Sequence, residues 1–188
     1  MGDLLRLNKS FVISRSGDTK KEIYSNLLKA SEFIKKTLHS GKHVWIAQKQ
    51  GRSKDGLDKT DPAVLKMLHI ALRKECKFEE LTDYYNIVPQ SVSYEIDPLA
   101  KEKGMHLQGE STKNENDDIS HIFKGVMEFK GNVNLSFGEQ LSGNYTPDEL
   151  AQEIDNSILN SYKLWDTNCY AYEFLHGEVD VCTYAQAS

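Results

Sequence analysis

The chain has 188 residues, of which 39% are hydrophobic and 10% aromatic, so it is long and apolar enough to bury the core of one domain. Its net charge of −5 argues against a general nucleic-acid binder, which needs a basic surface, but leaves open a local basic pocket for one small phosphate. No apolar run approaches the roughly 20 residues that cross a bilayer, and no signal peptide is visible. Cys76, Cys169 and Cys182 have no CxxC spacing, which predicts reduced packing thiols and neither a disulfide framework nor a metal site.

The first predicted elements are a strand, a helix and a second strand. The short apolar run at residues 11–14 predicts a strand that turn residues close. Thr19 then opens a helix, because Glu22 lies three residues further on as in a capping box, and Gly41 is well placed to end it. The apolar run at residues 43–47 predicts the second strand. This succession is the βαβ pattern, which implies neighbouring parallel strands.

The rest of the chain continues the alternation. Pro89 interrupts a third predicted strand and, having no N–H for the ladder, indicates a strand end, an edge or a bulge. The remaining expectations are a polar loop at 48–60, a helix opened by Asp61 and Pro62, the third strand at 85–94, a loop with a helical turn at 101–118, a helix at 119–127, a strand at 133–137, and a helix opened by the capping box of Thr146 and Glu149. The predicted fold is a single α/β domain over residues 1–188, with a mixed, largely parallel sheet flanked by helices.

The loop after the second strand is the most informative segment. Residues 48–56 (QKQGRSKDG) leave the end of a predicted buried strand, where open α/β sheets place their ligands. Gly51 lets the backbone approach a ligand closely, and Lys49, Arg52 and Lys54 are able to pair with phosphate oxygens. Charged residues in a glycine-containing loop are also common on plain solvated surface, and this pattern alone leaves both interpretations open.

Two further observations bear on the ligand of this loop. It is not a Walker A loop, because Leu57 and Asp58 follow Gly56 where Lys and Ser or Thr are required, so a nucleotide triphosphatase is disfavoured. Arg15 ends the first predicted strand, and the ends of parallel neighbours share one sheet edge. Arg15 and Arg52 would therefore converge on one anion, although two independent surface arginines explain the sequence equally well.

Several segments resemble the glycerolipid acyltransferase family, which transfers fatty acyl groups to glycerol 3-phosphate or lysophosphatidate. Residues 9–16 (KSFVISRS) are similar to that family's second conserved block, a hydrophobic strand ending in arginine. Residues 45–56 (WIAQKQGRSKDG) resemble the third block, and residues 87–95 (IVPQSVSYE) resemble the fourth, a strand carrying a proline. Residues 58–66 and 162–168 are similar to bacterial members. The three blocks occur in the family's order and spacing, and the resemblance covers nearly the whole chain.

The resemblance implies a role for several of these residues. Arg15 and Arg52 would bind the phosphate of the acyl acceptor, for which the planar, always charged guanidinium is well suited. Gly51 would allow close approach of the backbone to the substrate, and Pro89 would shape the acyl-donor side. Acyl-CoA or acyl-carrier protein would serve as donor substrate, with no cofactor and no metal. The implied substrate-binding residues are Arg15, Lys49, Gln50, Gly51, Arg52, Ser53 and Pro89.

This sequence departs from the family pattern at two positions within the blocks. The third block normally has glutamate before its glycine, and here that position is Gln50, which keeps hydrogen bonding but has no negative charge. The residue before the arginine of the second block is often charged, and here it is Ser14. Any role that needs a carboxylate at position 50 is therefore in doubt.

The largest departure concerns the catalytic motif. Family catalysis uses His-x-x-x-x-Asp, in which the histidine deprotonates the acceptor hydroxyl and the aspartate orients the imidazole. No histidine here has aspartate five residues later; the six are His39, His43, His69, His106, His121 and His176. The family motif precedes the second block, so we expect a domain that lacks its amino-terminal, motif-bearing region and has no catalytic residue of its own. A dedicated non-catalytic homologue is the alternative.

The sequence is thus compatible with three functions. The first is an acyltransferase domain of phospholipid biosynthesis that is inactive alone, and the second is a non-catalytic module that binds a phosphate ligand or lipid. The third is an unrelated phosphate-binding α/β domain, which requires the ordered blocks to be coincidence. The expected partners are an acyl donor and a phosphorylated glycerol acceptor, with a membrane surface for the full-length protein and no nucleic acid. The expected location is the cytoplasm, peripherally at the cytoplasmic face of the membrane.

Overall fold

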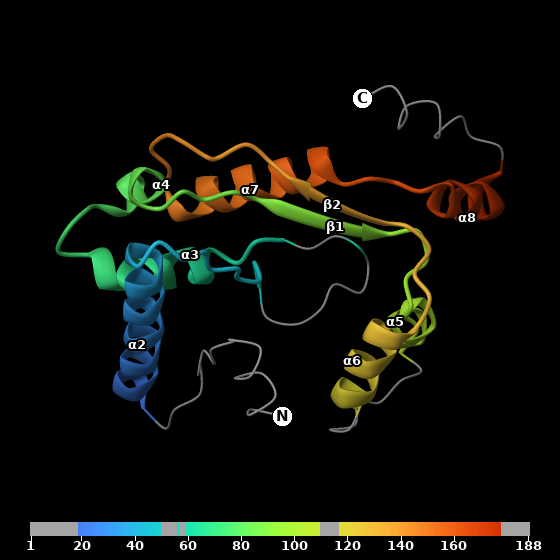
Figure 1. Cartoon of the computed structure of the whole chain (residues 1–188), viewed down its shortest axis with the longest axis horizontal. Coiled ribbons are helices and arrows are strands. Elements are labelled where there is room, and N and C mark those ends of the chain that lie inside the picture. Colours follow the sequence, from blue (N-terminus) through green and yellow to red (C-terminus); the bar gives the residue numbers. More distant parts are fainter. Residues whose placement is uncertain (1–18, 50–55, 57–58, 110–116, 178–188) are drawn as a thin grey trace. The chain divides into compact units, whose positions relative to one another are not determined.

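The computed structural model describes residues 19–49, 56, 59–109 and 117–177 (Figure 1). Its elements are helices joined to one small sheet. In chain order they are α2 (Lys20–His39), α3 (Pro62–His69), η1 (Ile70–Leu72), η2 (Phe78–Glu80), α4 (Leu81–Tyr84), β1 (Gln90–Tyr94), α5 (Ala100–Leu107), α6 (Asp117–Met127), β2 (Val133–Phe137), α7 (Pro147–Ser161) and α8 (Asp166–His176). None of these helices is both long enough and apolar enough to span a bilayer.

The chain forms two compact units. In the described residues, the first unit comprises 19–49, 59–87 and 140–155, and the second comprises 56, 88–139 without its gap, and 156–177. The boundary falls within α7, whose residues up to Asp155 belong to the first unit.

The first unit is built on α2 and α3. Thr19 caps α2, as expected, by accepting the backbone N–H of Glu22 at 3.2 Å. The helix ends at His39, and Gly41 follows with a φ of +76°, a conformation that suits glycine. A cluster of buried apolar side chains lies between these two helices and contains Ala30, Ile34, Val64 and Met67.

A buried serine joins α2 to the end of α3. Ser31 is fully buried, and its hydroxyl donates to the carbonyl of Leu68 at 3.1 Å. The same oxygen accepts the N–H of Ala71 at 2.9 Å. Both hydrogen bonds satisfy a hydroxyl that would otherwise be costly to bury, so Ser31 sets the position of α3 and η1 along α2.

The strand predicted at residues 43–47 is an extended segment outside any sheet. Val44 and Ile46 are half-buried against the α2–α3 core, whereas Trp45 between them is 74% exposed. The alternation of side chains is thus that of a strand, but one face packs directly on helices and the backbone joins no ladder. The strand predicted at residues 11–14 lies outside the described residues.

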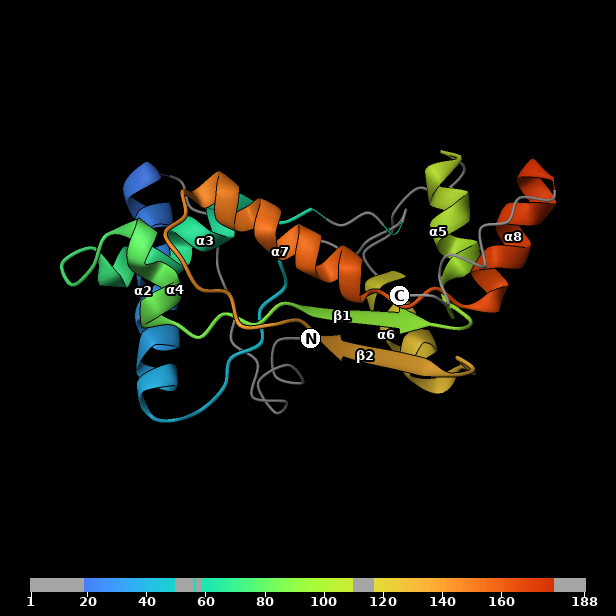
Figure 2. The same ribbon diagram turned by 90° about the horizontal axis from the view of Figure 1, so that it is seen from above.

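The sheet belongs to the second unit and corrects the predicted fold class. β1 and β2 form a two-stranded antiparallel sheet in which Val92 faces Leu135, and Figure 2 shows the two strands running in opposite directions. In the described part of the chain these two are the only strands, so the prediction of a largely parallel α/β sheet flanked by helices is wrong. The third predicted strand, at residues 85–94, is shortened to β1, because Pro89, which has no N–H for the ladder, stands just before it.

Several later predictions fit the structure well. The helix at 119–127 corresponds to α6, and the strand at 133–137 is β2. The capping box before α7 is complete: Thr146 N–H donates to Glu149 Oε2 at 2.8 Å, and Glu149 N–H donates to Thr146 Oγ1 at 3.3 Å. The loop predicted at 101–118 is wrong in its first part, where α5 forms and is joined to α6 by the ion pair of Glu102 with Lys124.

The cysteine interpretation holds for one residue and fails for another. Cys76 is a free, half-buried thiol, as predicted. Cys169, which is buried in α8, is disulfide-bonded, so the prediction of a reduced thiol is wrong at that position. Cys182 lies outside the described residues.

Candidate functional site

The structure describes two of the seven predicted substrate-binding residues. Lys49 is half-buried in the first unit, and Pro89 is buried in the second, where its carbonyl accepts the N–H of Gly138 at 2.9 Å. This bond joins the chain before β1 to the chain after β2, so Pro89 marks the strand end that its missing N–H indicated. Outside the described residues lie Arg15, Gln50, Gly51, Arg52 and Ser53.

The polar loop predicted at 48–60 is closed by hydrogen bonds at its two described ends. The N–H of Asp61 donates to the carbonyl of Gln48 at 2.9 Å, which brings the start and the end of the segment together. This bond joins the two described ends of the segment within the first unit. A closed loop has less conformational freedom to lose on binding a ligand than an open segment of the same length.

A side chain of α7 fixes the exit of this loop. Asp155 Oδ1 accepts the N–H of Thr60 at 2.8 Å and the hydroxyl of Thr60 at 2.6 Å. Thr60 is 7% exposed, so both bonds lie largely away from solvent. Charge-assisted bonds of this kind are among the stronger hydrogen bonds in proteins, and here they tie residues that are far apart in sequence.

The end of the loop is also the start of α3. Asp61 is the N-cap, with its Oδ1 accepting the N–H of Ala63 at 2.9 Å, and Pro62 occupies the first turn. A carboxylate thus already occupies the N-terminus of α3, where an anionic ligand would otherwise find backbone donors.

The charge of the loop is opposite to that of the chain. Residues 49–60 contain four basic side chains and two acidic ones, a net charge of +2 against −5 for the whole chain. Gly56 has a φ of +76° with open space around its Cα, so glycine is required there for its backbone conformation. The basic members are Lys49, Arg52, Lys54 and Lys59.

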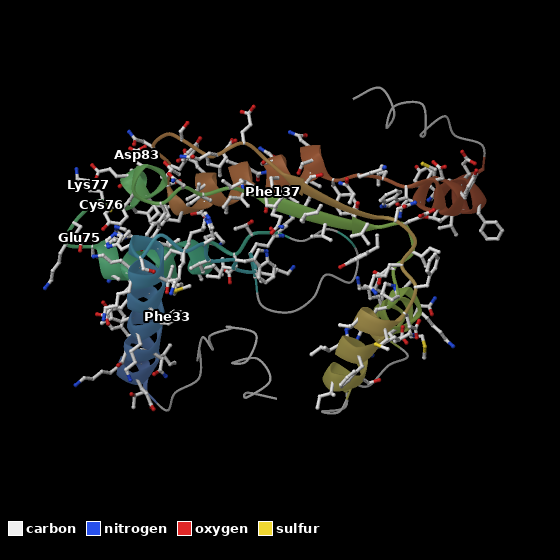
Figure 3. The ribbon with its side chains drawn as sticks, viewed as in Figure 1. Phe33, Glu75, Cys76, Lys77, Asp83 and Phe137 are labelled. Carbon is white, nitrogen blue, oxygen red and sulfur yellow. The ribbon has the colours of Figure 1, made fainter. Side chains whose placement is uncertain are left out.

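A second polar cluster, on α2 and the chain that follows η1, was not predicted from the sequence. Glu75 accepts hydrogen bonds from Lys35 Nζ and, at 2.7 Å, from the Tyr84 hydroxyl, which also lies 3.1 Å from His39 Nε2. Lys35 and His39 are four residues apart on one helical face, but no local signal marks their partners. Figure 3 shows Glu75 and Cys76 beside Lys77, where the chain turns toward α4.

The electrostatics of this cluster indicate a structural role. The hydrogen bond from Lys35 holds the pKa of Glu75 below its usual value, and the same bond raises the pKa of Lys35. Donation to Glu75 likewise raises the pKa of Tyr84. A general base or a nucleophile needs shifts in the opposite directions for these groups, so Lys35, Glu75 and Tyr84 hold their charges and protons in place and are not activated for either role.

An open depression of about 510 Å³ lies next to this cluster, lined by His69, Arg73, Lys74, Glu75, Cys76, Lys77 and Glu80. Burial raises the pKa of the Cys76 thiol, with further increases from Glu80 and Glu75, which disfavours a reactive thiolate. Arg73 packs over the Tyr24 ring at 5.8 Å and His69 Nε2 contacts the Cys76 carbonyl at 2.9 Å. Within the described part of the chain, no three His, Cys, Asp or Glu side chains are grouped to hold a metal ion.

Comparison of this chain with protein-family models, curated proteins and solved structures finds no match.

Proposed function

We propose that this chain binds the phosphate of a glycerol 3-phosphate or lysophospholipid acceptor, as part of an acyltransferase of phospholipid biosynthesis. The donor in this proposal is acyl-CoA or acyl-carrier protein, and the protein works peripherally at the cytoplasmic face of a membrane. The single observation that carries the proposal is the closed loop at residues 49–60. Its ends are held by Gln48 with Asp61 and by Thr60 with Asp155.

The chemistry of the loop fits a phosphate monoester better than other small ligands. Its net charge of +2 attracts an anion to one place on an otherwise acidic protein. Arg52 contributes a planar fork of donors that matches phosphate oxygens in a way that a lysine ammonium does not. The fixed ends reduce the cost of ordering the loop around its ligand.

Acyl transfer further requires a base that removes the proton of the acceptor hydroxyl, so that the oxygen attacks the thioester carbonyl and the thiol leaves. The sequence contains no His-x-x-x-x-Asp. In the cluster around Glu75, the raised pKa values keep Lys35 and Tyr84 protonated, so neither of these two groups is suited to be the base. We therefore expect the 188-residue chain to bind the acceptor without acylating it.

A non-catalytic phosphate-binding homologue is the second candidate, and Gln50 favours it. Where the resembling family has a glutamate before its glycine, this chain has a neutral amide. If the function were binding alone, the loss of that carboxylate would leave phosphate recognition intact and would remove a repulsive charge from the loop.

Calorimetric titration with sn-glycerol 3-phosphate tests the proposal. We expect binding of glycerol 3-phosphate, no detectable binding of glycerol, and an affinity about tenfold weaker or more for Arg52→Ala, because a charge-assisted bond to phosphate is lost. Arg73→Ala is the matched control, since Arg73 packs on Tyr24 outside the loop. Equal affinities for all three proteins would rule out the loop as the phosphate site.

A thiol-release assay with acyl-CoA separates the two candidates. The chain alone is expected to release no thiol in the presence of glycerol 3-phosphate. Turnover by the chain alone would show that the base lies within these 188 residues. Acylation that appears only when a longer form of the protein supplies a His-x-x-x-x-Asp motif supports the acyltransferase, and binding without acylation in that form supports the non-catalytic homologue.

A further inference from the structure

The two faces of the β1–β2 sheet have the reverse of the usual polarity. On one face the side chains are small and polar, and that face is covered: Ser91 and Ser93 are 4% and 1% exposed. Ser91 donates to the carbonyl of Ser161 at the end of α7, and Trp165 donates its indole N–H to Ser93 at 3.2 Å. An antiparallel sheet with one covered face normally buries its apolar side chains and exposes its polar ones.

The opposite face, here called the outer sheet face, is apolar and open. It contains every second residue of each strand: the polar, half-buried Gln90 opposite Phe137, and five apolar side chains at exposures from 39% to 65%, namely Val92 and Tyr94 of β1, and Val133, Leu135 and Phe137 of β2. Phe137 is labelled in Figure 3. Large apolar side chains that alternate with buried serines predict a second layer of protein over this face, because a sheet is stable when its apolar side is covered.

The area of the outer sheet face decides what size of partner it accommodates. Five side chains of this size, about half exposed, present roughly 500 Å², which is within the range of the largest apolar patch on a typical soluble protein, a patch that is often functional. Two copies of the face, packed against each other, bury about 1,000 Å² in total, which reaches the lower limit for a specific protein interface. The area therefore fits a second sheet of the same size.

The charge of the face also favours a second copy. No Lys, Arg, Asp or Glu contributes to it, so it has none of the charged groups that select a different partner over a like one. Two antiparallel two-stranded sheets pack face to face with their strands nearly aligned, and a two-fold axis gives both copies the same contacts. Outside this uncharged face, two chains of net charge −5 repel each other.

We propose that the outer sheet face is a self-association surface, on which a second copy of this chain packs its own outer sheet face to form a weak, two-fold symmetric dimer. The small area predicts a weak dimer, with a dissociation constant in the micromolar range or above. Added salt strengthens it, because salt screens the repulsion of the two acidic chains and breaks no ion pair in the contact. This inference does not depend on the proposed function.

Sedimentation of the 188-residue chain over about 1 μM to 1 mM tests the proposal. We expect a reversible monomer–dimer equilibrium that shifts toward dimer when salt is raised. Leu135→Lys, at the centre of the face and 51% exposed, is expected to raise the dissociation constant about tenfold or more. Circular dichroism checks its fold, and Val92→Lys, at the cross-strand neighbour of Leu135, replaces it if the fold is lost.

Leu159→Lys is the matched control. Leu159 is 58% exposed on α7, the helix whose end contacts the opposite, polar face of the sheet. A dissociation constant within about twofold of the unmodified chain is expected for this variant. The proposal is overturned if the unmodified chain is a monomer at every concentration. It is also overturned if Leu159→Lys weakens the dimer as much as Leu135→Lys does, or if the dimer persists in both Leu135→Lys and Val92→Lys. Flotation of a monomeric chain with phosphatidylcholine vesicles, abolished by Leu135→Lys, also overturns it and assigns the face to a lipid surface.

Discussion

Single polar side chains fix the geometry of the first unit, and Asp155 is the clearest case. One carboxylate oxygen accepts both the backbone N–H and the hydroxyl of Thr60, so a residue on α7 determines where the basic loop ends. Ser31 has the same kind of role between α2 and the end of α3. These bonds join positions 95 and 37 residues apart in sequence, which is why no local pattern predicts them.

Asp155→Ala is expected to lower the free energy of unfolding by about 1–3 kcal/mol, because it leaves two largely buried donors of Thr60 without their acceptor. Asp155→Asn retains an acceptor oxygen at the same place and is expected to cost less. Urea unfolding of both variants, with glycerol 3-phosphate affinity measured in parallel, checks this. Equal stabilities of the Ala variant and the unmodified chain would show that the two bonds contribute nothing.

The ion pair of Lys35 with Glu75 predicts a defined pH dependence. The pKa of Glu75 is lowered in the fold, so its ionised form stabilises the chain above its ordinary value of 4.5, and this contribution is lost as the pH falls through the lowered pKa. The pKa of Lys35 is raised, so its contribution is present below 10.5 and is lost as the pH rises through the raised pKa. Between these limits both charges are in place.

Glu75→Gln is therefore expected to reduce stability at neutral pH and to flatten the decline that the unmodified chain shows below about pH 4.5. Urea midpoints measured from pH 7 down to pH 3 give both curves. Glu32→Gln removes a carboxylate from the exposed side of α2, outside the cluster, and controls for net charge. Parallel curves for Glu75→Gln and the unmodified chain would contradict the assignment.

At the scale of elements, the sequence predicts helices well and the sheet poorly. The starts of α2, α3 and α7 each have a local cause, namely a capping side chain with its partner two or three residues away. Strand pairing has no such local cause, because β1 and β2 are separated by 38 residues. Residues 43–47 have the alternation of a strand, yet Val44 and Ile46 find their burial on helices.

Gly138, directly after β2, packs so closely against Ser157 of α7 that there is no room for a side chain at position 138. A Cβ on Gly138 would lie 2.2 Å from Ser157 Oγ and 3.6 Å from Ser157 Cβ. Gly138→Ala is thus expected to destabilise the fold, and the double variant with Ser157→Ala to recover most of the loss, a coupling of about 0.5–3 kcal/mol. A double-mutant cycle by urea unfolding measures it. Additive single effects would mean that Ser157 simply rotates away.

At the scale of the whole molecule, composition and length predict a folded chain correctly, whereas the assumed parallel sheet is wrong. The βαβ interpretation placed Arg15 and Arg52 at one sheet edge, and in the described residues there is no parallel pair to define such an edge. What remains of the candidate site is the part with a local origin: a polar, glycine-containing loop followed by an Asp-Pro helix start. The closure of this loop by Asp155 could not be predicted from the sequence, because Asp155 lies 95 residues from Thr60.

Stability at this scale is expected to depend on few apolar side chains, because many others are exposed. Leu72 has no exposed surface, and Leu72→Ala is expected to lower the free energy of unfolding by about 2–5 kcal/mol. Leu175 is 73% exposed, so the same substitution there is expected to change it by about 0.5 kcal/mol or less. Thermal and urea unfolding of the two variants compare a buried with an exposed leucine. Similar losses at both positions would place Leu175 in a packed environment.

The chain contains two tryptophans, and each belongs to a different unit. Trp45 is 74% exposed beside the α2–α3 core, while Trp165 donates its indole N–H to Ser93 and lies under the ammonium of Lys163, 4.0 Å from the ring centroid. Their fluorescence is therefore expected to differ: Trp45 emits at long wavelength, in contact with water, and Trp165 is the more shielded. Loss of the short-wavelength emission is therefore expected to follow the unfolding of the second unit through Trp165, whereas Trp45 is already in contact with water in the folded chain and changes little.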